Sequence, residues 1–266
     1  MNYFSLIDEE WLHQIALDPM MQAGATSDRL WEAFSRYSRV PSAKLWVTLQ
    51  TALLKRLYSP DLTPDSKRRL SEMCIIVWVW SCRGHNYTLK AAGLRNALSL
   101  ADDDVRAAAA WQFASIFFAA KADEQDDPPI QERWRELGHR FFDEVWPLEA
   151  TLQSSASAND FARIPASVGP PLFADAVSII TPFLVPFKVW SVRTEFRLET
   201  DNDWTKEIAQ FYAEELLTLL SLSISDDQGH GVFDLGRLLD LILSFHPNLQ
   251  GDYRIQRLRK MAVESA

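Results

Sequence analysis

The run "CIIVWVWSC" at 74–82 is the most apolar stretch of the chain, and it strongly limits what the chain can fold into. It falls well short of the roughly 20 apolar residues that a membrane-spanning helix needs. Upstream, Thr63 and Pro64 suit the N-cap and first position of a helix, and Gly84 downstream is a typical helix stop. The run also lacks the period-2 alternation of a strand. We therefore predict a helix over about 64–83, whose second half is apolar all round and packed on every side.

Two cysteines on this helix and a histidine just after it raise the question of a metal site. Cys74 and Cys82 share a face with His85, but eight residues separate the cysteines, which is roughly 12 Å along a helix axis. Two thiolates on one zinc need sulfurs within about 4 Å, and a disulfide is excluded by the same separation. Cys82 and His85 could supply half a site, but the chain has only 2 Cys. We interpret both cysteines as core residues and predict no metal site.

The rest of the chain repeats the theme of apolar stripes bounded by helix caps and prolines. Four leucines, Leu45, Leu49, Leu53 and Leu57, follow one another at a spacing that puts them on one face of a helix. Only 9 of the 266 residues are Gly, which disfavours a turn-dense β fold. We predict an all-α protein of about eleven helices, joined by short loops so that successive helices run antiparallel.

We expect two helical subdomains, 1–150 and 151–266, within one continuous array. The boundary is indicated by "SSASANDFARIPASVGPP" (154–171), in which small residues mix with Pro and Gly. This stretch is not a disordered linker, because large apolar residues such as Phe161 and Ile164 interrupt it.

One segment of the first subdomain, 88–121, has the pattern of a helical repeat. It contains "LRNALSLADDDVRAAAAWQFASIF", which predicts a short helix, an acidic turn and a second helix. This pattern resembles a unit of the HEAT repeat family, in which a turn Asp and a following Arg tie adjacent units and alanines permit close packing. The resemblance assigns those roles to Asp103 or Asp104, to Arg106 and to Ala107–Ala110. It implies a HEAT-like array of antiparallel helix pairs, whose curved surfaces suit the binding of other macromolecules.

Sequence motifs of catalysis are missing. The chain has no Gly-x-x-x-x-Gly-Lys loop, no Gly-x-Ser-x-Gly elbow and no His-Glu-x-x-His pair, and its 5 His are scattered. The stretch "GHGVFD" (229–234) begins like a dinucleotide-binding motif, but Asp234 replaces the third Gly. We predict that the chain is not an enzyme, with no catalytic residue and no cofactor.

The net charge of −9 disfavours nucleic acid as a partner, because an acidic surface repels the phosphate backbone. The N-terminus lacks the basic and apolar regions of a signal peptide. No window is long and apolar enough to span a membrane. We therefore expect a cytoplasmic protein that does not associate with membranes.

Two segments are candidate protein-binding surfaces. In "PFLVPFKVWSVRTEF" (182–196), aromatic residues follow no helical period, so rings can lie at the surface beside Arg, as they do in many interfaces. The alternative is an ordered loop folded back onto the core. The second segment, "YRIQRLRK" (253–260), predicts a helix that is basic on one side. The residues predicted to bind a protein partner are Phe187, Trp190, Arg193, Phe196, Arg254, Arg257 and Lys260.

Several stretches resemble the helical C-terminal regions of large bacterial anti-phage defence proteins, in which such regions act as sensors or scaffolds. The stretches are "RLWEAFSR" (29–36), "LRNALSLADDDVRAAAAW" (94–111), "GPPLFADAVSIITPFLVPF" (169–187) and "LGRLLDLILSFHPNLQGDYRIQRL" (235–258), together about a quarter of the chain. We expect no effector domain of the kind that precedes these regions in those proteins. The resemblance therefore implies a separate recognition module that acts with a separately encoded effector.

The leading hypothesis is a non-catalytic helical-repeat protein that binds another protein as a recognition or scaffold subunit. One alternative is an enzyme of unfamiliar type, in which His and carboxylate side chains converge between helices. Another is a nucleic-acid-binding module that uses the basic C-terminal helix.

Overall fold

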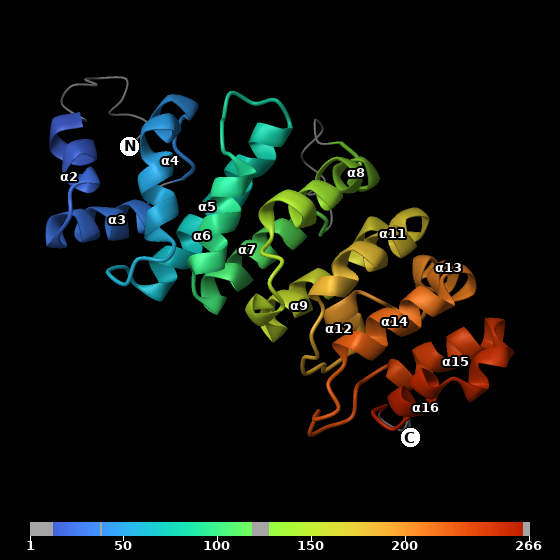
Figure 1. The fold of residues 1–266 in the computed structure, drawn as a ribbon. Helices are drawn as coiled ribbons and strands as arrows, with labels where there is room; N and C mark the ends of the chain where they lie inside the picture. Colours follow the sequence, from blue (N-terminus) through green and yellow to red (C-terminus); the bar gives the residue numbers. More distant parts are fainter. Residues whose placement is uncertain (1–12, 38, 119–127, 263–266) are drawn as a thin grey trace. The chain divides into compact units, whose positions relative to one another are not determined.

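The computed structural model describes residues 13–37, 39–118 and 128–262. These residues form an all-α fold, in which helices are joined by turns and loops and the only β contacts are isolated bridges (Figure 1). The predicted fold class is therefore confirmed. The helices outnumber the eleven expected, because several are only one turn or so long. The chain divides into two compact units, residues 1–113 with 143–147 and residues 114–142 with 148–266.

The first unit is built around one long central helix. Its helices are α2 (Asp18–Met21), α3 (Ala25–Tyr37), α4 (Ala43–Arg56), α5 (Pro64–Cys82), α6 (Ala91–Leu100) and most of α7 (Asp103–Ser115). Both α3 and α4 pack on α5, and the buried Ser71 hydroxyl of α5 donates to the backbone carbonyl of Val105 in α7. The central position expected for this helix is what the structure shows.

The ends of α5 lie where the sequence places them. The hydroxyl of Thr63 accepts a hydrogen bond from the backbone N–H of Ser66, and Gly84 follows the helix with a φ of 73°. In the apolar half, Trp78 is 1% exposed and packs on the ring of Phe113. Cys74 is buried, and burial raises the pKa of its thiol far above the ordinary value. The apolar run is therefore the interior of a helical unit.

The helix pair of α6 and α7 has the predicted helix–turn–helix form. Arg106 donates to the carbonyls of Leu98 and Ala101 at the end of α6 and also pairs with Asp103. These contacts lie within the pair itself. The pair is joined to α5 by the buried Lys67, which pairs with Asp102, and by the bond from Ser71 to Val105. Arg106, which the HEAT resemblance expects to tie neighbouring units together, instead holds the turn between α6 and α7.

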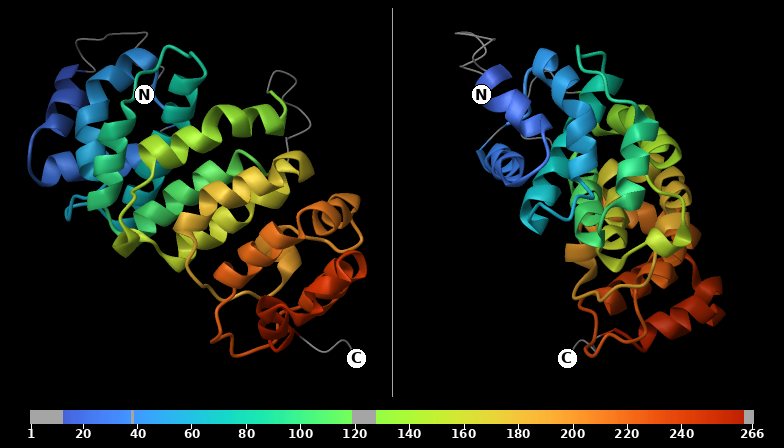
Figure 2. Two further views of the ribbon diagram at one scale, coloured as in Figure 1. Left: turned by 45° about the vertical axis from the view of Figure 1, so that its right-hand side comes forward. Right: turned by 60° about the vertical axis from the view of Figure 1, so that its left-hand side comes forward.

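The second unit contains helices that pack in successive pairs. They are α8 (Ile130–Arg140), α9 (Ser155–Ala162), α10 (Ile164–Val168), α11 (Pro170–Ile180), α12 (Val192–Phe196), α13 (Asp203–Phe211), α14 (Ala213–Ser223), α15 (Leu235–Phe245) and α16 (Tyr253–Arg259). Helix α11 packs on α13 and α14, which in turn pack on α15 and α16. This order, from yellow through orange to red, is visible in both views of Figure 2.

The chain passes from one unit to the other within α7, after residue 142 and after residue 147, and the last of these points is close to the boundary expected near residue 150. The stretch 154–171 forms α9, α10 and the start of α11 inside the second unit. Phe161, Ile164 and Val168 are all fully buried in that unit. The small residues of this stretch therefore serve close packing.

The stretch between α11 and α12 folds back onto the loop that joins α14 to α15. Phe187 donates its backbone N–H to Ser223 and accepts from Ser225, while Trp190 accepts from Phe233. The residue pairs Phe187–Ile224 and Ser191–Phe233 form parallel bridges. The stretch is therefore an ordered loop held by its backbone, as the alternative interpretation expected.

Candidate protein-binding site

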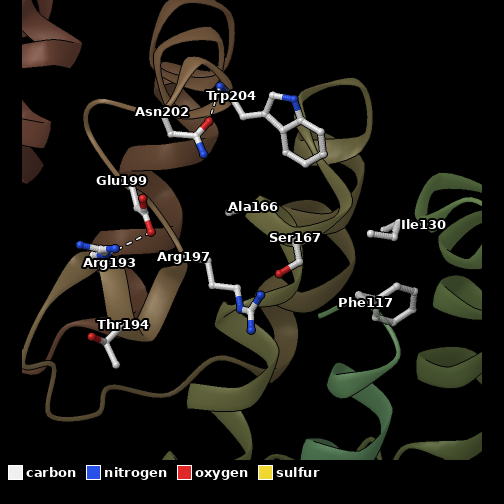
Figure 3. Close-up of a pocket in the computed structure, with 10 residues that line it drawn as sticks. All are labelled: Phe117, Ile130, Ala166, Ser167, Arg193, Thr194, Arg197, Glu199, Asn202 and Trp204. Carbon is white, nitrogen blue, oxygen red and sulfur yellow. Dashed lines mark hydrogen bonds and ion pairs between the residues drawn. The ribbon is translucent and has the colours of Figure 1, made fainter. Parts of the chain in front are cut away.

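A cleft of about 540 Å³ opens on the second unit near the end of α12 (Figure 3). Side chains reach it from the segment after α7, from the start of α8, from α10, from α12 and its following loop, and from the start of α13. Its buried lining includes Phe117, Ala166 and Ser167, and its exposed rim includes Arg193, Arg197 and Trp204.

The single turn of α12 positions the cationic rim. Its N-cap is Ser191, whose hydroxyl accepts from the backbone N–H of Arg193 at 3.1 Å, while the Glu195 carboxylate accepts from the N–H of Ser191 at 2.9 Å. These reciprocal bonds fix the start of the turn. At its end, Arg197 has a φ of 58°, and its N–H donates to the carbonyl of Val192. This left-handed residue closes the turn at the edge of the cleft.

Two of the three arginines around the cleft have carboxylate partners. Arg193 donates to Glu199 at 3.0 Å. Arg163, the residue between α9 and α10, has its Nη1 atom 3.4 Å from the Oδ1 atom of Asp160. Arg197 instead lies over the ring of Phe118, with its guanidinium carbon 4.1 Å from the ring centroid. Partial burial lowers the pKa of Arg197, and the nearby positive charge of Arg163 lowers it further. Within the described part of the chain, no carboxylate pairs with Arg197.

Trp204 forms one wall of the cleft. The amide oxygen of Asn202 caps α13 by accepting from the backbone N–H of Trp204 at 2.8 Å, and the indole is 45% exposed. The indole lies against Gly169, which has a φ of 86°. A β-carbon built at Gly169 would meet ring atoms of Trp204 at 3.1 and 3.2 Å. A residue with no side chain therefore allows the indole to take this position.

The aromatic residues predicted from the 182–196 segment have different fates. Phe187 and Phe196 are buried and pack on each other with ring centroids 5.9 Å apart, so neither is available to a partner in this fold. Trp190 is 57% exposed and lies beside Phe233 and His230. Of this segment, Trp190 and Arg193 are the predicted residues that reach the surface.

The basic residues of α16 mostly hold that helix against α14. Arg254 pairs with Asp252 and Glu214, and hydrogen bonding to Asp252 is the main cause of its raised pKa. Arg257 pairs with Asp226 and donates to the carbonyl of Ser221. These arginines are engaged within the unit. Lys260, the third predicted residue here, is exposed.

Of the cleft residues, Arg193 was predicted from the sequence and the others were not. Arg197 and Trp204 lie in "RLETDNDW", where no helical period indicates which side chains meet. Phe117 and Ser167 lie about 50 residues apart in the sequence, and only tertiary packing brings them to one cleft. The single local signal is "DND" before Trp204, which is typical of a helix N-cap and does mark the start of α13.

The cleft does not have the composition of a catalytic or metal site. Its described lining contains one carboxylate, that of Glu199, and neither His nor Cys. In the described ranges no cluster of three or more His, Cys, Asp or Glu could hold a metal ion. Elsewhere in the unit His139 lies 3.2 Å from Asp175, but that carboxylate also accepts from the indole of Trp134 at 2.6 Å. The pair is exposed and has an evident structural role.

Comparison with protein families, with curated proteins and with solved structures found no match to this chain. Among the described helices, none is both long enough and apolar enough to cross a membrane.

Proposed function

We propose that this chain is a non-catalytic protein-binding module that receives a segment of a partner protein in the cleft beside α12. The observation that carries the proposal is the lining itself, in which an exposed indole and two exposed arginines surround a buried apolar surface. Aromatic residues and Arg are enriched where proteins bind each other. The partner is a separately encoded protein, and we place the pair in the cytoplasm.

The proposal gives the chain the role of a recognition or scaffold subunit in a HEAT-like stack of helix pairs. The successive packing of α11, of α13 with α14, and of α15 with α16 supports this architecture. The resemblance of four stretches to helical regions of bacterial defence proteins supports a role in anti-phage defence. Deletion of the gene should then lower resistance to phage infection, and a plating assay on the native host measures that effect.

The engagement of the α16 arginines favours this proposal over nucleic-acid binding. Arg254 and Arg257 already donate to carboxylates and carbonyls of the same unit. A phosphate backbone would have to displace those partners, against a net charge of −9. Protein binding at the cleft requires no such displacement.

Site-specific photo-crosslinking in living cells tests the proposal. A benzoyl-phenylalanine at Thr194, an exposed cleft residue, should capture a defined protein. The matched control is the same group at Gln256, which is exposed on α16 in the same unit. Equal capture at both positions, or no capture at Thr194, would contradict the proposal.

A further inference from the structure

Among the described residues around the cleft, one cation is in surplus. Arg193 and Arg163 are each matched by a carboxylate, Glu199 and Asp160, whereas Arg197 has the face of an aromatic ring as its only described partner. In addition, the Nε atom of Arg163 is buried without a hydrogen-bond acceptor in the described part of the molecule. The two guanidinium groups are close enough for Arg163 to lower the pKa of Arg197. An anion beside Arg197 would relieve this excess of positive charge.

The backbone at Arg197 gives a second and independent reason to look for a ligand. Its φ of 58° is left-handed, a conformation that is unfavourable for a residue with a β-carbon and that Gly or Asn adopts with less strain. A guanidinium at this position is therefore not explained by the turn. Residues held in such conformations gather at binding sites, where the strain serves to aim a side chain.

The direction of the side chain completes the geometry. Figure 3 shows Arg197 extending into the cleft toward Ser167. The hydroxyl of Ser167 donates to the carbonyl of Arg163 at 2.8 Å, so the guanidinium is the donor available at that point. At the rim, Asn202 uses its oxygen to cap α13, which leaves its amide N–H groups to donate. The cleft thus offers donors to an occupant that brings acceptors.

We infer that Arg197 anchors a carboxylate of the partner's bound segment, so that the cleft recognises an acidic residue next to an apolar one. This inference rests on the proposed function and names the chemistry of the ligand. The planar guanidinium fork matches a carboxylate with two parallel hydrogen bonds. The exposed indole of Trp204 gives the neighbouring apolar side chain a surface to pack on.

Nuclear magnetic resonance titration with two short peptides tests the inference. The probes are acetyl-Glu-Leu-amide and acetyl-Gln-Leu-amide, which differ only in the charge of the acidic side chain, and the signal is the Nε–H resonance of Arg197. We expect the Glu peptide to shift this resonance and to bind at least tenfold more tightly than the Gln peptide. Equal binding of the two peptides would overturn the inference. Inorganic phosphate that binds as tightly as the Glu peptide would also overturn it, since the site would then be one for a free anion.

Matched variants separate recognition from folding. Arg197→Asn suits the left-handed backbone, so its melting temperature should be unchanged or higher, while its affinity for the Glu peptide should fall about tenfold to 100-fold. Arg197→Lys keeps the charge without the fork and should lose less. Arg237→Gln removes an exposed cation of α15 that lies outside the cleft and pairs with Asp234, so its affinity should change less than about threefold. Similar losses in Arg237→Gln and Arg197→Asn would show that no specific carboxylate contact exists.

The crosslinking experiment at Thr194 distinguishes failure of the inference from failure of the proposed function. Strong capture in the native protein and weak capture in Arg197→Asn supports both. Equal capture in the two proteins would leave the cleft as a protein-binding site and would refute the carboxylate anchor.

Discussion

Helix α5 in the first unit and the segment 184–197 in the second both bury large aromatic side chains, but their backbones are satisfied in different ways. In α5 the helix itself satisfies the backbone, and side-chain bonds such as that of Ser71 are additional. In 184–197 the N–H and C=O groups of Phe187 and the N–H of Val189 find partners in the loop at 223–233. The segment therefore depends on distant residues, and it has rings on both sides, with Phe187 buried and Trp190 exposed.

This difference decides what each region can do. No residue in the apolar half of α5, 74–82, is exposed. A segment held by its backbone can instead direct individual side chains outward. Trp190, Arg193 and Arg197 reach solvent from this segment or its end. Recognition is accordingly expected in the irregular region, as is common for segments that a rigid scaffold holds in place.

The largest expected contrast is between two tryptophans. Trp78→Ala empties a fully packed site in α5 and should lower the free energy of unfolding by about 3–5 kcal/mol. Trp190→Ala removes a ring that is more than half exposed and should change it by only about 0.5 kcal/mol. Urea denaturation followed by circular dichroism measures both. Comparable losses would mean that the two regions do not differ in the way described.

The next prediction concerns the pH dependence of stability that Asp160 causes. Asp160 lies on α9, which packs on α12 at the end of the segment 184–197. Burial raises the pKa of Asp160 to about 6, and Arg163 opposes part of that rise. Between pH 3.8 and 6 the folded chain holds a proton that the unfolded chain has lost, so stability falls as the pH rises through this window.

Asp160→Asn cannot ionise, so it should be more stable than the native protein by up to about 3 kcal/mol at pH 8 and by only about 0.5 kcal/mol at pH 4. Urea denaturation at the two pH values measures this difference. A gain that is the same at pH 4 and pH 8, or a loss at pH 8, would show that the ion pair with Arg163 outweighs burial.

Gln228 provides a more direct test of the backbone-held segment. Its buried amide accepts from the N–H of Val189 at 2.9 Å and donates to the carbonyls of Phe187 and Ser225. Gln228→Ala removes the side-chain partner of these backbone groups and should lower the free energy of unfolding by about 2 kcal/mol. Hydrogen exchange should show the amide of Val189 losing protection while α5 stays protected. Unchanged exchange at Val189 would mean that the segment does not depend on this side chain.

The matched change in α5 should have the smallest effect. Ser71→Ala removes a hydroxyl that donates to the carbonyls of Arg68 and Val105. Both carbonyls lie within helices, whose own backbone hydrogen bonds remain after the substitution. We expect a loss of about 1 kcal/mol or less in the free energy of unfolding. A loss as large as that of Gln228→Ala would remove the proposed distinction between helical and segment backbone.

The same distinction explains how far the sequence could predict the structure. The two ends of α5 are determined by nearby residues, Thr63 and Pro64 at its start and Gly84 after its end. This helix and the all-α class could therefore be predicted from the local sequence alone. No local pattern indicates that Phe187 turns inward and Trp190 outward, because the loop at 223–233 fixes those directions. The cleft is harder still, since Phe117, Ser167 and Arg197 meet only through packing between distant segments.

The glycine behind the indole of Trp204 has a consequence for how selectivity could change. A β-carbon at Gly169 would press on the ring, and the φ of 86° at this position is itself unfavourable for any residue but glycine, so a substitution there should push the indole toward the opening and narrow the space for an occupant. Position 169 is not itself among the lining residues. The size of the side chain that is accepted is therefore expected to depend on a residue that an occupant never touches.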